Sequence, residues 1–258
     1  MIQNVDPGAG APSDLTPPKK SGCWLYSLLG VVAVVLLIGL LLPATRTSRE
    51  APRRAQCANN LKQIMLAMHT YADTFGAFPP AYTVDANGKP LHSWRTLLLP
   101  YCEGAEVFKK LDLSKPWDDP VNAELFEQFT KQTGPAAFRC PSNDIPRGMT
   151  AYLAIVTPNS CLRPGEGRRL EDIKDDTSNT VVVIEVPADK AVRWMEPVDA
   201  DEALMLSIGA DRDSRSPHPS GFMVGFCDGS VRLLRNELSA EDRRALITID
   251  ARDKVELP

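Results

Sequence analysis

The chain has 258 residues, 43% of them hydrophobic and 24% charged, with a formal net charge of -4. This length allows one large domain or two small ones. The weak negative charge offers no electrostatic attraction for a polyphosphate, which excludes nucleic acid as an expected partner.

Residues 1–22 are predicted to form a disordered N-terminal tail. The segment, MIQNVDPGAGAPSDLTPPKKSG, contains four prolines, three glycines and almost no bulky apolar side chain. It cannot bury enough apolar surface to offset the entropy lost on ordering.

A transmembrane helix is predicted at residues 23–43. The run Cys23–Leu42 holds twenty residues without a charge, and a helix of that length spans a hydrocarbon core of roughly 30 Å. A secretory signal usually has an apolar run of only about 7 to 15 residues. We therefore expect a retained single-pass anchor, followed by one domain at residues 44–258.

The charges that flank the predicted span favour an orientation weakly. Lysines at positions 19 and 20 precede the span, whereas arginines at positions 46, 49, 53 and 54 follow it. By the positive-inside rule alone, the part C-terminal to the span would be cytoplasmic.

The six cysteines lie at positions 23, 57, 102, 140, 161 and 227 and include no CxxC pair. This argues against a zinc ribbon or a thioredoxin-like site. With Cys23 in the predicted span, the other five allow at most two disulfides and one free thiol. Disulfides require an oxidising compartment, and unpaired buried thiols are the alternative.

A second helical pattern follows the predicted span. Pro43 and Pro52 are expected to kink or interrupt a helix, but apolar residues then recur at steps of three and four within residues 53–75. The stripe consists of Leu61, Ile64, Met65, Met68, Tyr71, Ala72 and Phe75. Gly76 supplies a stop signal, so we predict an amphipathic helix that packs one face on the rest of the domain.

Short extended segments dominate the remainder. An Asn87-Gly88 turn signal lies between two of them, and Asp119-Pro120 is typical of the start of a helix, which is predicted to reach Gln132. Strands are predicted at residues 137–140, 151–156, 180–186, 191–196 and 222–234, and a final helix from Ser239. Because several strands are separated by only a few residues, antiparallel pairing is favoured. The predicted fold class is α+β, with the amphipathic helix packed on an antiparallel β-sheet.

The stretch HPSGFMVGFCDG places His218 ten positions before Asp228. Apolar residues alternate on both sides of Asp228-Gly229, which predicts a β-hairpin closed by a primed turn. An extended segment covers about 3.3 Å per residue, which separates the two side chains by roughly 20 Å or more. A hydrogen-bonded catalytic dyad needs about 3 Å, so we interpret the pair as the two ends of a strand.

The chain contains only three histidines, His69, His92 and His218. His69 lies at the edge of the helical stripe and His92 in an extended segment, and no HExxH-like spacing links them. GxSxG, P-loop and Rossmann patterns are also absent from the sequence. We therefore predict no catalytic residues and no metal site.

An acidic segment, Asp172, Asp175, Asp176 and Asn179, offers oxygen ligands that a calcium ion could use. The same residues suit an ordinary turn, because Asp, Ser and Asn side chains bond their own backbone. Trp194 could line a ligand pocket, although an aromatic residue in a strand more often belongs to the core.

Six stretches, taken together and in order, resemble the domain of unknown function 1559 family. They are CANNLKQIMLAMHTYADTFGAFPP (57–80), LHSWRTLLLPY (91–101), FRCPS (138–142), DDTSNTVVVIEV (175–186), RWMEPVD (193–199) and HPSGFMVGFCDGSVRLL (218–234). Members of this family resemble type IV pilins and type II secretion pseudopilins at the N-terminus and carry an H-x9-DG signature, here His218, Asp228 and Gly229. The family is also catalogued as a bacterial solute-binding type. The resemblance implies an extracytoplasmic domain behind an N-terminal membrane helix, which takes precedence over the arginine count.

The sequence departs from the pattern at two positions. Gly22 fits the glycine that precedes the apolar run of a prepilin, but Ser27 stands where a prepilin has glutamate, which weakens the expectation of cleavage and polymerisation. Ala72 stands where the family often has a second histidine, which argues further against a metal site. Because Cys57 and Cys140 both lie in family motifs, the resemblance points to a disulfide between them.

The expected function is that of a single-pass protein of the cytoplasmic membrane with a pilin-like domain on the periplasmic or extracellular side. Its role would be structural or in assembly, without catalysis or a cofactor, and its partners would be membrane lipid and proteins of a secretion or pilus-like assembly. The alternative is a membrane-tethered module that binds a solute, a glycan or calcium through residues 172–179 and Trp194.

Overall fold

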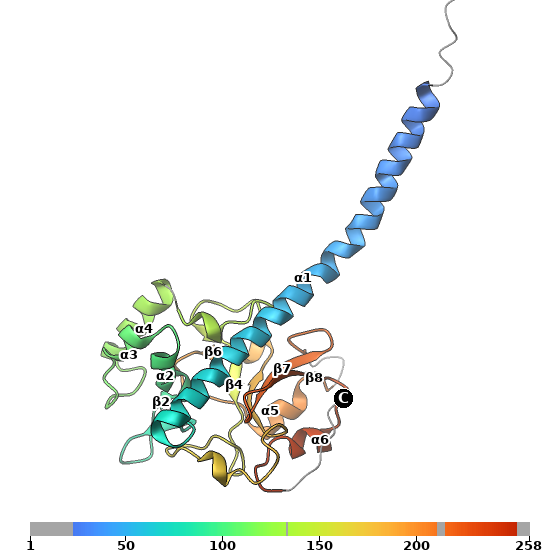
Figure 1. Ribbon diagram of the computed structural model, residues 1–258. Coiled ribbons are helices and arrows are strands. Elements are labelled where there is room, and N and C mark those ends of the chain that lie inside the picture. The colour runs from blue at the N-terminus through green and yellow to red at the C-terminus, as the bar shows by residue number, and fades with distance from the viewer. Residues whose placement is uncertain (1–22, 133, 211–214, 252–258) are drawn as a thin grey trace, which may run out of the picture. The chain divides into compact units, whose positions relative to one another are not determined.

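The computed structural model describes residues 23–132, 134–210 and 215–251, without the side chains of Cys23, Leu25 and residues 40–49 (Figure 1). The predicted tail at residues 1–22 lies outside this range. The chain divides into two units, Met1–Ser48 and Arg49–Pro258. Helix α1 (Cys23–Phe75) supplies the described residues of the first unit and the beginning of the second.

Valine, leucine and isoleucine side chains of α1 between Leu28 and Ile38 are exposed in the first unit. In the described part of the chain, no helix is both long and apolar enough to cross a membrane. The structure describes the side chains of only part of the predicted span at residues 23–43.

In the second unit α1 remains helical through Pro52, where the sequence suggested an interruption. Proline removes one backbone hydrogen bond, but the apolar stripe that follows it is buried and stabilises the helix by packing. Leu61, Ile64, Met65 and Met68 are each fully buried. The predicted amphipathic helix is confirmed, and it ends at Phe75 as expected from Gly76.

Within the described residues, three antiparallel sheets form the β-structure, which confirms the α+β class. The main sheet has the order β4-β5-β7-β8, with β4 (Tyr152–Ala154), β5 (Val181–Glu185), β7 (Gly221–Phe226) and β8 (Val231–Arg235). Two small sheets pair β1 (Tyr82–Val84) with β2 (Pro90–Ser93), and β3 (Met149–Thr150) with β6 (Val192–Arg193).

The shorter helices are α2 (Trp94–Leu97), α3 (Ala105–Phe108), α4 (Pro120–Gln132), α5 (Glu202–Ser207) and α6 (Ala240–Ala245). The predicted helix at 120–132 is confirmed by α4. The predicted helix start at Ser239 is confirmed by α6, because the Asp242 amide donates to Ser239 Oγ at 3.0 Å.

Two predicted strands are wrong or shorter than expected. Residues 136–138 form a 3-10 turn, and the strand expected at 191–196 is reduced to Val192–Arg193. The aromatic side chains explain both differences, because the rings of Phe138 and Trp194 stack with centroids 6.3 Å apart instead of continuing a ladder. Tertiary packing here overrides strand propensity.

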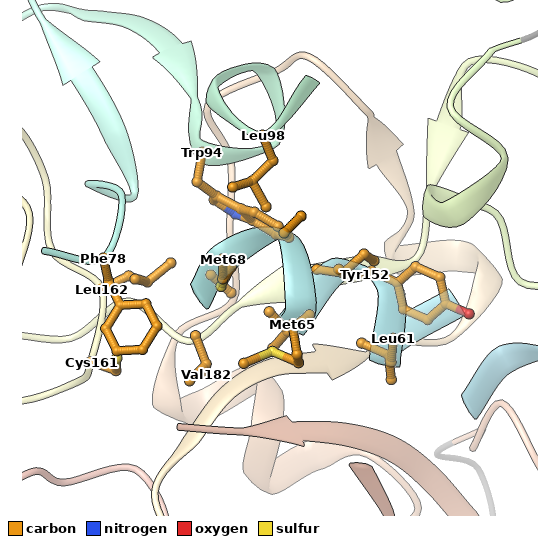
Figure 2. Packing of buried hydrophobic residues seen from close by; sticks show 14 of the residues in the cluster. Leu61, Met65, Met68, Phe78, Trp94, Leu98, Tyr152, Cys161, Leu162 and Val182 are labelled. Atoms are coloured by element: carbon orange, nitrogen blue, oxygen red, sulfur yellow. The ribbon is translucent and has the colours of Figure 1, made fainter. Parts of the chain in front are cut away.

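The main sheet is covered on both faces. On one face α1 packs against Met223 and Gly225 of β7, where a Cβ on Gly225 would lie 2.7 Å from Met65 Sδ. Figure 2 shows Trp94 and Leu98 on the opposite side of α1 from Val182 of β5, so the helix is buried between two layers. On the other face of the sheet, alternate residues of β7 share a core cluster with Met205 of α5 and with Leu246, the residue that follows α6. Since both faces are buried, β7 is buried along its whole length.

Candidate functional site

The H-x9-DG stretch contains strand β7 and a turn at each end. His218 and Gly221 exchange backbone hydrogen bonds of 3.0 and 3.1 Å before the strand. Strands β7 and β8 pair in register, with Phe222 opposite Leu234, which confirms the predicted hairpin. Its loop is one residue longer than a two-residue primed turn, because Phe226 pairs with Ser230 across residues 227–229. Gly229 has φ +84, the left-handed conformation that three-residue loops place on glycine.

The imidazole of His218 lies between two carboxylates. His218 Nδ1 is 2.7 Å from Glu50 Oε1 of α1, and Nε2 is 3.0 Å from Glu185 Oε2 of β5. The side chains of His218 and Glu185 are 0% exposed, and that of Glu50 is 32% exposed. Glu185 Oε2 also accepts the Met223 amide at 3.4 Å, whereas buried Glu185 Oε1 has no hydrogen-bond partner among the described residues.

These contacts favour the charged imidazolium. Burial lowers the pKa of His218, but hydrogen bonds and charges from Glu185 and then Glu50 outweigh it and leave the pKa raised above 6.5. A protonated ring donates from both nitrogens, which matches an acceptor on each side.

A disulfide lies directly beside this ion pair. Cys57 of α1 is bonded to Cys140, the pair expected from the family resemblance. The ligand atoms of Cys57, Cys140, Glu185 and His218 all lie within 4.8 Å of one another. We call Glu50, Cys57, Cys140, Glu185 and His218 together the α1 latch, because the disulfide joins α1 to the loop at Cys140 and the contacts of His218 join Glu50 of α1 to Glu185 of β5.

Two neutral hydrogen bonds reinforce the α1 latch. Asn60 Nδ2 of α1 donates to the Arg139 carbonyl at 2.6 Å, and the Tyr152 hydroxyl of β4 donates to the Cys57 carbonyl at 3.4 Å. The Tyr152 ring lies next to Leu61 of α1 in Figure 2. Burial and then the charge of Glu185 raise the pKa of Tyr152 well above 10.0, so the hydroxyl stays a donor.

The other end of the H-x9-DG stretch meets α1 as well. A Cβ on Gly229 would lie 3.4 Å from His69 Nε2, so the turn lies directly against His69. The His69 ring packs edge-on against Phe78 with centroids 5.4 Å apart. Glu50 and His69 are nineteen positions apart, which is about 28 Å of helix. The H-x9-DG stretch thus contacts α1 on both sides of β7, at Glu50 through His218 and at His69 through Gly229.

The remaining predicted site residues serve the fold. His92 of β2 is fully buried, and burial lowers its pKa. Within the described residues, the group of potential metal ligands contains one histidine, His218. His69, His92 and His218 therefore do not meet as a three-histidine centre.

The acidic segment makes local turn bonds at Asp172, Asp176 and Asn179, while Asp175 bonds the C-terminal segment at Ala251. Asp172 accepts the Arg169 amide at 3.2 Å, Asp175 accepts the Ala251 amide at 3.1 Å, and Asp176 accepts the Ser178 amide at 2.9 Å. The Asn179 amide donates to the Asp176 carbonyl at 2.8 Å. Calcium binding at this segment remains a prediction.

Trp194 is 1% exposed and packs against Phe126 and Phe129. Its indole N–H donates to Thr130 Oγ1 at 3.3 Å. The side chain belongs to a core cluster, which matches the second of the two interpretations that the sequence allowed.

Sequence reasoning missed Glu185 and Glu50. Glu185 could have been found, because it is the only charged residue in the apolar run VVVIEV, and a buried charge in a strand needs a partner. Glu50 carries no such signal, because it lies among charged residues of an exposed-looking segment.

A second buried charge pair was also missed. Arg95 is fully buried and contacts Asp199 Oδ1 at 2.7 Å, and its other N–H groups reach the carbonyls of Trp194, Glu196 and Val198 at 2.8 Å each. This pair joins the two family-like stretches, because Arg95 lies in LHSWRTLLLPY and Asp199 in RWMEPVD.

The α1 latch offers chemistry of two kinds. The buried imidazole of His218 contacts two carboxylates and is closed to solvent, which suits a structural contact better than proton transfer to a substrate. The cysteines can exchange electrons only through opening of their disulfide.

Comparison with known proteins gives one match. The family model SBP_bac_10, described as protein of unknown function (DUF1559), matches residues 46–160. No curated protein and no solved structure matches the chain. The matched range contains Glu50, Cys57 and Cys140 of the α1 latch, while the H-x9-DG stretch lies C-terminal to it. Residues 46–160 of the chain are therefore similar to the family of proteins of unknown function called DUF1559.

Proposed function

We propose that this protein is a membrane-anchored, extracytoplasmic protein with a pilin-like domain and a structural or assembly role, without catalysis. The observation that carries the proposal is the α1 latch. It ties a long N-terminal helix to the loop at Cys140 by a disulfide and to strand β5 by the contacts of His218 with Glu50 and Glu185, as a domain needs when force or a partner acts through that helix.

Three further features support the proposal. The uncharged run Cys23–Leu42 has the length of a bilayer span. A disulfide is stable in an oxidising compartment and rare in the cytosol. The only histidine that contacts carboxylates in the described residues is 0% exposed, which leaves no room for a substrate at its ring.

The membrane topology of the protein tests the proposal. Glu127 lies on α4 with its side chain 57% exposed, so a cysteine introduced there should react with a membrane-impermeant maleimide in intact spheroplasts. A cysteine at Gln3, N-terminal to the apolar run, is the matched control and should react only after lysis. The reverse labelling pattern, or recovery of the protein from the soluble cytosol, would refute the proposal.

Binding of a solute is the second candidate function. A surface groove with a volume of about 870 Å³ is lined by side chains of both charges, Arg53 and Arg139 with Glu103 and Asp144, and by the amides of Gln56, Asn60 and Gln63. This mixed polar lining would suit a polar solute. A ligand at a hundred times its Kd stabilises the native state by about 2.7 kcal/mol.

Thermal unfolding of the full-length protein in detergent, with calcium and with a panel of anionic solutes and glycans, tests this candidate. A ligand-dependent rise in Tm that disappears in Arg139→Gln would favour binding at the groove. No rise with any ligand would leave the structural role as the better account.

A further inference from the structure

The α1 latch contains a complete set of ligands for a metal ion. Cys57, Cys140, Glu185 and His218 each offer one ligand atom, and all four residues are buried. In the structure the two sulfurs are bonded to each other. We propose that reduction of this disulfide converts the four residues into a binding site for a thiophilic divalent cation of the zinc class.

The spacing of the ligand atoms suits tetrahedral coordination. Zinc bonds of about 2.0–2.3 Å imply ligand atoms roughly 3.3–3.8 Å apart. The four atoms now lie within 4.8 Å of one another, so shifts on the order of an ångström would suffice once the sulfurs separate. Two thiolates, an imidazole and a carboxylate form a donor set that zinc prefers over hard cations.

One carboxylate oxygen of Glu185 is buried without a hydrogen-bond partner among the described residues. This oxygen is Oε1, and the side chain of Glu185 is 0% exposed. An unpaired buried carboxylate oxygen costs free energy. A cation beside it would supply the missing interaction.

Glu50 supplies the outer support that a metal-binding histidine needs. Metal-bound imidazoles usually donate their second N–H to a carboxylate, which orients the ring and raises its basicity. With His218 Nε2 directed to the metal, Nδ1–H would donate to Glu50 Oε1, now 2.7 Å away. Glu50 is therefore a positioning residue in this site.

A dithiol reductant breaks the Cys57–Cys140 bond by thiol–disulfide exchange, is oxidised to its own disulfide, and leaves two protonated cysteines. The cation then displaces both thiol protons to solvent, and any proton on His218 Nε2. Cys140 is among the residues that line the groove of about 870 Å³ described above. Because Cys57 and Cys140 are both fully buried, a reductant and an ion reach the site only when the structure opens locally at this groove.

The test uses the full-length protein in detergent, reduced with a phosphine because a phosphine adds no thiol ligand. Cobalt(II) replaces zinc as the probe, since its thiolate charge-transfer and tetrahedral d–d absorption report the ligands directly. We expect one equivalent to bind after reduction and none before it. The Cys57→Ser/Cys140→Ser variant should bind none, while Cys161→Ala/Cys227→Ala, which keeps the α1 latch, should bind as the parent does.

Glu50→Gln keeps the test decisive if the cysteine variant does not fold, because Glu50 lies at the rim of the site. It should weaken cobalt affinity about 10- to 100-fold while the thiolate absorption persists. The proposal is overturned if the reduced protein binds no cobalt, if it unfolds on reduction even with excess zinc, or if Glu50→Gln binds as tightly as the parent. Binding that is lost in Cys161→Ala/Cys227→Ala but retained in Cys57→Ser/Cys140→Ser would overturn it as well.

Discussion

Replacing Cys57 and Cys140 with serine is expected to lower the free energy of unfolding by about 4 kcal/mol under oxidising conditions. The disulfide closes a loop of sequence separation 83, and the entropy that it removes from the unfolded chain grows with the logarithm of that length. Denaturant unfolding of the full-length protein in detergent, followed by the fluorescence of buried Trp94 and Trp194, measures the change.

Two controls distinguish the effect of losing the disulfide from the effect of replacing cysteine side chains. Cys102→Ser alters a thiol outside the disulfide and should change the free energy of unfolding by less than about 1 kcal/mol. Phosphine with a chelator should destabilise the parent to the level of the double variant and leave that variant unchanged. An unaltered unfolding midpoint in Cys57→Ser/Cys140→Ser would show that the bond does not stabilise the fold.

His218→Ala is expected to destabilise the disulfide-bonded protein by about 3–5 kcal/mol, because it leaves Glu185 buried without a charge partner. Both side chains are 0% exposed, so water cannot replace the lost contact without opening the core. The measurement is the same denaturant experiment, carried out near pH 6.

A double-mutant cycle provides the control. Adding Glu185→Ala removes the uncompensated charge, so the double variant should lose about 0.5–3 kcal/mol less than the sum of the two single changes. His92 is also fully buried but forms no ion pair among the described residues, so His92→Ala combined with Glu185→Ala should be nearly additive. Additivity in the His218 cycle would contradict the role assigned to the ion pair.

The contribution of the His218–Glu185 pair to the free energy of unfolding depends on pH. The pKa of His218 is raised from 6.5 in the native state, so its stabilising contribution is complete below pH 6.5 and is lost as the pH rises through the higher native pKa. Glu50, Glu185 and, beside Glu185, Tyr152 are the other titratable groups around the ring, and the pKa of Tyr152 is too high for it to ionise in this range. The stability gap between the parent and His218→Ala should therefore narrow at alkaline pH.

Local patterns along the chain determined several elements by themselves. The stripe after Pro52, the Asp119-Pro120 helix start, the Ser239 cap and the alternation around Asp228-Gly229 each depend on neighbours a few residues apart, and the corresponding helices and hairpin are present. The same patterns place His218 and Asp228 at opposite ends of one strand, and the length of an extended segment is sufficient to exclude a dyad between them.

Tertiary structure alone decided what His218 contacts. Glu50 and Glu185 lie 168 and 33 positions away from His218 along the chain, and no local rule relates residues at such separations. The segment at 136–138 likewise forms a 3-10 turn where a strand was predicted, and there the ring of Phe138 stacks on that of Trp194, a residue 56 positions away in the chain. The sequence by itself therefore determined the long helices and the β7–β8 hairpin, but not the segments at 137–140 and 191–196. Only folding brought a histidine, two carboxylates and two cysteines together at one point on α1, since the free energy of such contacts depends on burial that exists only after the helix lies on the sheet.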